Sequence, residues 1–284
     1  MAIQSTRVPR GDVTATISFY APPADGSIPY NLVRDPKPGE AVRNFGDDFQ
    51  QILIRDVRGS EDSLTLDHDS VKVVRNLPPS TEQDFTDDAS IKANFYPEVE
   101  DLLLKNVPGS SKVVIFDHTI RRADPNASRN PVLKAHIDQT LKAAEARVRR
   151  HLPEDEAEER LKGRYRIINV WRPLNKNPVE SFPLAFASSA SVRDADVIPV
   201  QHIYETFTGE TASIAFHPDQ QWQYLSGMTG DERLLLQCFD SEALKEGSKV
   251  RGGRLAHTAF DHPGTLPDAE GRESIEVRAL VFGP

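Results

Sequence analysis

The sequence predicts a mainly β protein with flanking helices, whose core is a barrel or a double-sheet roll. Two observations lead to this fold class. Most apolar stretches in the second half of the chain are short and are separated by turn-forming residues, as strands of such folds are. Only one substantial helical pattern interrupts these stretches, so the regular alternation of strands and helices that builds a parallel sheet is missing.

The first 110 residues are expected to form strands and one helix that flank the core. Weak alternation predicts short strands at VTATISFY and QQILIRDVRG, and a further strand ending in a turn at LDHDSVKVVRNLPP. A helix follows within IKANFYPEVEDLLLKNVPGS, because four apolar side chains share one helical face: Phe95, Val99, Leu102 and Leu103. The Pro-Gly pair at 108–109 ends this helix.

Residues 111–284 are expected to form the core of a single domain that spans residues 1–284. Its first strands are predicted at SKVVIFDHTIRR and VLKAHI. A helical insertion is predicted over 139–162, where one apolar face carries Leu141, Ala144, Val148 and Leu152. Later strands are predicted at RYRIINVWRPL, SFPLAFASSASV, VIPVQHIYETF, GGRLAHTAF and ESIEVRALVFG.

Composition narrows the function classes. The chain has 284 residues with 38% hydrophobic and 27% charged residues, no apolar run of membrane-spanning length and no signal-peptide pattern, so a cytoplasmic protein without a membrane partner is expected. The net charge of −9 and the lack of a basic block argue against nucleic acid as a partner. One cysteine, Cys238, excludes an internal disulfide. The common nucleotide-binding and serine-hydrolase motifs are missing from the sequence.

A candidate metal motif lies in PVLKAHIDQT. On a strand, positions i and i+2 point to the same side, so His136 and Asp138 are able to bind one ion together. An iron(II) oxygenase needs two histidines and one carboxylate on one face of the metal, with the opposite face open. The third ligand should come from a distant strand, and the tail of the chain offers His257 and His262.

A second motif follows in the tail, at the start of the last predicted strand. Arg272 and Ser274 are two residues apart and therefore share one face of the strand. A guanidinium forms a bidentate pair with a carboxylate, and a neighbouring hydroxyl adds a hydrogen bond. The order H-x-D, H, R-x-S is thus what a metal centre with a dicarboxylate co-substrate requires, and it is more specific than any of its parts.

With these motifs the chain resembles the iron(II)- and 2-oxoglutarate-dependent oxygenases. Within them it is most similar to the fungal and bacterial hydroxylase/desaturase group, which includes aspergillic-acid hydroxylase, gibberellin desaturase-like and cephamycin methoxylase-associated proteins. The resemblance is carried by VVIFDHTIRR, AHIDQT, INVWRPL and RESIEVRALVF. It implies a double-stranded β-helix (jelly-roll) core. It also implies iron(II) at His136, Asp138 and His257, and 2-oxoglutarate bound by Arg272 and Ser274.

The resemblance further implies a reaction with dioxygen in which a small-molecule substrate, of secondary metabolism by analogy, is hydroxylated or desaturated. His262 lies ten residues before Arg272, the spacing found in many relatives, whereas His257 lies fifteen before it. His257 is preferred because GRLAHTAF is a plausible strand, while a proline and a glycine follow His262. Two rivals stay open: a metal-dependent isomerase or lyase on the same scaffold without 2-oxoglutarate turnover, and a small-molecule binding protein.

Five further side chains are candidates for the site, each with an ordinary structural alternative. Asn169 is a candidate for co-substrate binding, since it lies on a strand in INVWRP where Asn169 and Trp171 share one face and Arg172 the other. Substrate contacts are expected from Trp171 and Arg172, unless the tryptophan belongs to the core. Arg121 and Arg122 either bind a substrate carboxylate or pair with surface acids.

Overall fold

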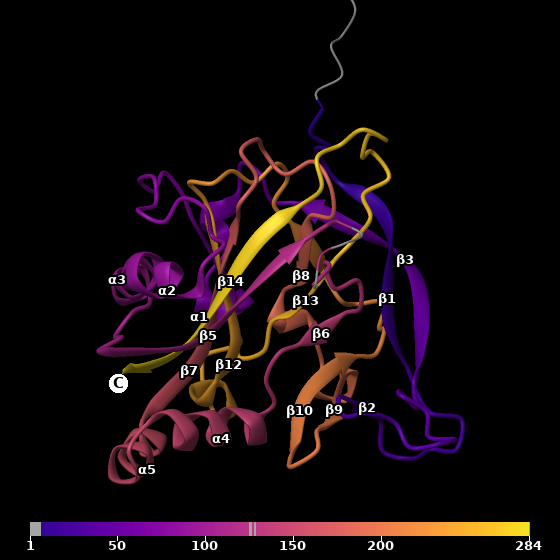
Figure 1. The fold of residues 1–284 in the computed structure, drawn as a ribbon, viewed down its shortest axis with the longest axis vertical. Helices are drawn as coiled ribbons and strands as arrows, with labels where there is room; N and C mark the ends of the chain where they lie inside the picture. Colours follow the sequence, from indigo (N-terminus) through magenta and orange to yellow (C-terminus); the bar gives the residue numbers. More distant parts are fainter. Residues whose placement is uncertain (1–6, 125–126, 128, 284) are drawn as a thin grey trace, which may run out of the picture.

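Two β-sheets form the protein, as the computed structural model of residues 7–124, 127 and 129–283 shows (Figure 1). The expected mainly β fold class is confirmed. A five-stranded sheet lies between helix α3 (Tyr96–Asn106) and the nine-stranded sheet (Figure 1). The apolar face of the five-stranded sheet packs against this helix, so its other face is available for a site.

The nine-stranded sheet contains strands from both halves of the chain. Its order is β1 (Val13–Ala21), β3 (Gly46–Asp56), β11 (Trp222–Tyr224), β8 (Leu184–Ala187), β13 (Ala256–Ala259), β6 (His136–Ile137), β10 (Thr208–Ile214), β9 (Val197–Ile203) and β2 (Tyr30–Leu32). The sequence predicts a longer strand at VLKAHI, but only two residues of it pair as β6. This short strand lies between β13 and β10, far from its neighbours in sequence.

The five-stranded sheet has the order β4 (Val71–Val74), β12 (Arg233–Asp240), β7 (Arg164–Pro173), β14 (Glu273–Gly283) and β5 (Lys112–Arg122). In β14 the residues alternate between two environments, as strand geometry requires. Ile275 and Val277 pack in the core on the side of α3. Ser274, Glu276 and Arg278 line a cavity on the opposite side. Over residues 274–278, strand β14 therefore has one apolar and one polar face.

The helices follow the predicted positions with two corrections. The expected strand at LDHDSVKVV begins as a one-turn helix, α1 (Leu66–Asp69), which Thr65 caps, and only Val71–Val74 pairs as β4. The segment before α3 contains α2 (Asp88–Ser90) and a π-helical turn (Ile91–Phe95). None of the described helices is long and apolar enough to cross a membrane.

The expected insertion over 139–162 contains α4 (Leu141–His151) and α5 (Glu154–Lys162). Ala144 and Val148 are buried as predicted, but Leu141 is 46% exposed because it begins the helix at its outer edge. Strands of the first 110 residues join both sheets. The boundary of a single domain over 1–284 stays a prediction.

Candidate metal centre

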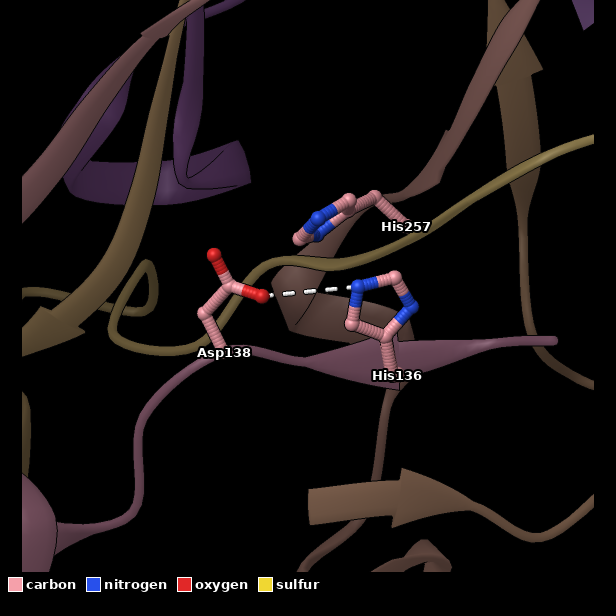
Figure 2. Close-up of side chains that lie close together, drawn as sticks. All are labelled: His136, Asp138 and His257. Atoms are coloured by element: carbon pink, nitrogen blue, oxygen red, sulfur yellow. Dashed lines mark ion pairs between the residues drawn. The ribbon is translucent and has the colours of Figure 1, made fainter. Parts of the chain in front are cut away.

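Strand register brings the two preferred histidines together. His257 of β13 lies directly opposite His136 of β6, and their ring centroids are 4.4 Å apart. Asp138 follows β6 at once and turns its carboxylate toward both rings (Figure 2). One ligand atom from each of these three side chains lies within 4.8 Å of the others. We call this group the His–Asp–His cluster.

Backbone carbonyls orient both histidines in the same way. Nδ1 of His136 lies 2.8 Å from the carbonyl oxygen of Lys134, and Nδ1 of His257 lies 3.1 Å from that of Leu255. A carbonyl oxygen only accepts, so in each neutral ring Nδ1–H donates and Nε2 keeps its lone pair. This is the arrangement that metal-binding histidines adopt. Both rings are thus held for ligation through Nε2.

Two donors hold one oxygen of Asp138 and leave the other for the cluster. Asn169 Nδ2 donates to Asp138 Oδ2 at 2.8 Å, and Arg278 Nε donates to the same oxygen at 3.1 Å. Oδ1 lies 3.4 Å from His136 Nε2 instead (Figure 2). Asn169, expected to bind the co-substrate, therefore contacts the carboxylate of the cluster. It is not among the residues that line the cavity.

The protonation of the cluster follows from these contacts. Burial alone would raise the pKa of Asp138, but Arg278 and the histidines hold it well below its usual range, so the carboxylate is ionised. Burial lowers the pKa of His257, which favours its neutral form. Burial also lowers the pKa of His136 and is the largest single influence on it, but the hydrogen bond and charge of Asp138, with the Lys134 carbonyl and the Glu276 charge, together raise that pKa. The negative potential that attracts a proton to His136 would equally attract a divalent cation.

Arg278 is a site residue that the sequence analysis missed. Besides Asp138 it donates to Glu276 at 2.5 Å, to Thr119 at 3.0 Å and to Asp117 at 3.2 Å. The signal was present in RESIEVR, because the period of a strand continues from Arg272 and Ser274 to Glu276 and Arg278. Glu276 and Arg278 of this strand thus face the cavity, not solvent.

A narrow cavity of about 30 Å³ adjoins the cluster. Three of its lining residues were expected from the R-x-S motif and the strand INVWRP: Arg272, Ser274 and Trp171. Arg121 lines it as well, and burial lowers the pKa of its guanidinium. Glu276 and Arg278 also line the cavity, so charged side chains gather around it.

Arg272 is buried in this cavity without a carboxylate partner among the described residues. Its side chain is 2% exposed, and its guanidinium donates to the carbonyl oxygen of Phe182 at 2.6 Å. It lies over the Trp171 ring at 5.5 Å, and its Nε has no hydrogen-bond partner in the described chain. Burial lowers its pKa to about 9. Because this guanidinium lines a cavity beside the cluster, an anion bound there would offset the cost of burying its charge, so the cavity is suited to an anionic ligand.

Three candidates of the sequence analysis do not reach the cavity. Arg122 pairs with Glu273 at 2.9 Å, and both side chains are partly exposed at the edge of the sheet. Arg172 lies on the opposite face of β7, with its guanidinium 4.8 Å from the Phe85 ring centroid. His262 lies 3.3 Å from the Tyr224 hydroxyl, apart from the cluster. Strand alternation accounts for the positions of Arg122 and Arg172, and His262 lies in the loop beyond the end of β13.

Comparisons with known proteins agree with this geometry. A family model described as Oxidoreductase/YMDC permease-like domain matches residues 17–282. The hydroxylase/desaturase poxK of Penicillium oxalicum is 38% identical over 300 residues, which cover 96% of this chain and 92% of that protein. The Fe(II)/2-oxoglutarate-dependent dioxygenase nvfI of Aspergillus novofumigatus is 33% identical over 87% of this chain and 88% of that protein. A solved structure of the iron and alpha-ketoglutarate-dependent endoperoxidase NvfI superposes with a TM-score of 0.86 at 30% identity, covering 97% of this chain and 99% of that one.

Proposed function

Because this chain belongs to the family of Fe(II)/2-oxoglutarate-dependent hydroxylase/desaturase oxygenases, we propose that its His–Asp–His cluster is the iron centre of the reaction. The chain is an oxidoreductase of this class, and the family uses iron(II), 2-oxoglutarate and dioxygen. The superposition on NvfI over nearly the whole chain also confirms the expected jelly-roll core.

The residues of the cluster fit iron(II). Two imidazole nitrogens and one carboxylate oxygen are the ligand set of mononuclear iron(II) oxygenases, and they leave positions open for a co-substrate and dioxygen. His136, Asp138 and His257 would supply this set. Asn169 and Arg278 would act on the carboxylate alone, by keeping Oδ2 engaged so that Oδ1 faces the ion.

The single observation that carries the proposal is the buried guanidinium of Arg272 beside this cluster, which has no acidic partner within the part of the chain that the structure describes. The distal carboxylate of 2-oxoglutarate would pair with this guanidinium, and the Ser274 hydroxyl would add a hydrogen bond. Trp171, which stacks on the guanidinium, would hold it in place. Dioxygen would be the oxidant for hydroxylation or desaturation, with iron(II) to activate it and 2-oxoglutarate as the electron donor, and the protein would supply binding, orientation and exclusion of water.

The organic substrate is a small molecule in this proposal, in line with the names of the relatives, which are hydroxylases, desaturases and dioxygenases. Arg121 is the remaining cation of the cavity with no acid within hydrogen-bond distance in the described chain, since its guanidinium donates only to the carbonyl oxygen of Asn130. Of the two candidates Arg121 and Arg122, we therefore retain Arg121 as a substrate contact.

The proposal is tested by adding iron(II) and then 2-oxoglutarate to the purified protein without oxygen. The weak visible charge-transfer band of an iron–2-oxoglutarate chelate is expected in the wild type, and it should be lost in Arg272→Leu at the same co-substrate concentration. Iron binding without any band would favour the isomerase or lyase alternative. A protein that binds no iron at all would refute the metal centre.

A further inference from the structure

A larger hollow adjoins the cavity at Asp138, which lines both. It has a volume of about 350 Å³, against about 30 Å³ for the cavity. We call it the α4–hairpin cleft, because it lies between α4 and the hairpin of β9 and β10, which are neighbours at one end of the molecule (Figure 1). Pockets for organic ligands have volumes of roughly 300–1,000 Å³, so the cleft has the size that the cavity lacks.

The helix side of the cleft combines small residues with cations. Ala143 and Ala146 leave space between the helix and the hairpin, and the cations around them are Lys142, Arg147 and Arg150. These positions recur at helical spacing and therefore share one face of α4. Within the described residues none of the three cations has an acidic partner; Arg147 only lies over the Phe116 ring, at 5.0 Å.

The acidic groups of the cleft offset only part of this charge, because among the described residues neither Glu210 nor Asp138 forms an ion pair with the three cations. The Glu210 carboxylate accepts a hydrogen bond from the hydroxyl of Thr140, the residue that caps α4. The Asp138 carboxylate is engaged by Asn169 and Arg278. Positive charge therefore remains on the helix wall, within reach of a ligand in the cleft.

The hairpin side presents two stacked aromatic rings. The Tyr204 and Phe207 ring centroids are 4.2 Å apart with an interplanar angle of 10°. A turn fixes the pair, since Tyr204 N donates to the carbonyl oxygen of Phe207 at 3.0 Å. The two side chains are nevertheless 37% and 52% exposed. An apolar molecule in the cleft would cover them.

We propose that the α4–hairpin cleft binds the organic substrate, and that it selects a molecule with an apolar or aromatic body and an anionic group such as a carboxylate. The aromatic pair would contact the body and the cations of α4 would bind the anion. The cleft meets the cavity at Asp138, so a molecule seated in it lies next to the His–Asp–His cluster. This inference rests on the proposed function.

A fluorine-labelled aromatic carboxylate, para-(trifluoromethyl)cinnamate, tests the cleft by fluorine NMR, with the corresponding neutral amide as the comparison probe. Binding is measured to protein loaded with 2-oxoglutarate and either Zn(II) or Mn(II). The variants are Arg147→Gln/Arg150→Gln and Tyr204→Ala/Phe207→Ala. Arg149→Gln is the matched control, because Arg149 is on the same helix but pairs with Glu145 and Glu158 outside the cleft.

The carboxylate probe is expected to bind the wild type. Its affinity for the double arginine variant should be about tenfold lower, because two partly exposed ion pairs are lost. The amide should bind more weakly, and Arg149→Gln should behave as wild type. Loss of the aromatic pair should weaken the binding of both probes. Mn(II) should broaden the resonance of the bound probe, whereas Zn(II) should not.

The proposal would be overturned if the carboxylate probe binds the double arginine variant as tightly as the wild type. It would also be overturned if Arg149→Gln weakens binding as much as the double arginine variant does, because the effect would then come from the overall charge of the protein. The proposal would also be overturned if the Mn(II)-loaded protein binds the probe without broadening its fluorine resonance. Metal content measured in the same samples distinguishes failure of the cleft proposal from failure of the iron-centre proposal. Protein that takes up no metal but binds the probe through the arginines would refute the iron centre and support the cleft.

Discussion

Replacing Arg278 with methionine should destabilise the folded protein by about 3–5 kcal/mol, although Arg278 is not itself one of the three candidate metal ligands. The guanidinium donates to three carboxylates, and two of them are buried: Asp138 with 13% and Glu276 with 12% of the side chain exposed. Methionine has a similar length and no charge, so these carboxylates would stay buried without their counter-charge. That is the situation in which breaking a buried ion pair costs most.

The third partner adds little to this magnitude. Asp117 is 42% exposed, so water screens its pair with Arg278 and its share is about 0.2–1 kcal/mol. A loss of 3–5 kcal/mol corresponds to a decrease in melting temperature of about 6–10 °C for a chain of this size. Arg122→Met is the control, because Arg122 pairs with Glu273 across the same two strands, where both are partly exposed. Its expected cost is at most about 1 kcal/mol.

The assay is urea unfolding of metal-free protein in the presence of a chelator, so that metal binding does not contribute to the free energy of unfolding. Metal-free conditions are essential because loss of Arg278 is also expected to weaken metal binding through Asp138. A decrease below about 1 kcal/mol for Arg278→Met, equal to that of Arg122→Met, would show that the buried carboxylates do not depend on this guanidinium.

Three further predictions follow from the site and its surroundings. His257→Ala should abolish iron binding while His262→Ala retains it, as measured by metal content after gel filtration; the reverse result would identify His262 as the ligand. Arg272→Leu should weaken 2-oxoglutarate binding by about 2–5 kcal/mol in an anaerobic titration, because a buried ion pair is lost, and an unchanged affinity would remove Arg272 from the co-substrate site. Burial alone would raise the pKa of Asp47, but Lys134 and a neighbouring arginine lower it to about 2, below the unfolded value. The stabilisation by Asp47 is thus present above about pH 4 and is lost as the pH falls toward 2, so the stability difference between wild type and Asp47→Asn should shrink on acidification; a difference independent of pH would contradict it.

The fold class and the ligand motifs could be predicted from the sequence because they depend on local periodicity. Short apolar stretches with turn signals indicated strands, and H-x-D and R-x-S placed pairs of side chains on one strand face. The same alternation placed the side chains of Trp171 and Arg172 on opposite faces of their strand. It does not say which face of a strand points to the cavity, and only the packing of α3 on the opposite face of the sheet decided that.

Contacts between distant strands could not be predicted in this way. The sequence could not choose between His257 and His262 on geometry, because the choice depends on the register of β13 against β6. The hydrogen bonds of Asn169 and Arg278 to Asp138 likewise join strands of different sheets. The α4–hairpin cleft exists only because a helix and a hairpin that are distant in the sequence meet.

By itself, then, the sequence determined the β-rich core, and from residue chemistry and a two-residue period it predicted the candidate ligand types and the arginine that we propose to bind an anion. The tertiary structure decided which histidine joins the cluster, which side chains orient its carboxylate and where a substrate has room. The physical reason is that strand register and sheet packing are set by the sum of many side-chain contacts across the whole chain, and no short stretch of sequence contains that sum.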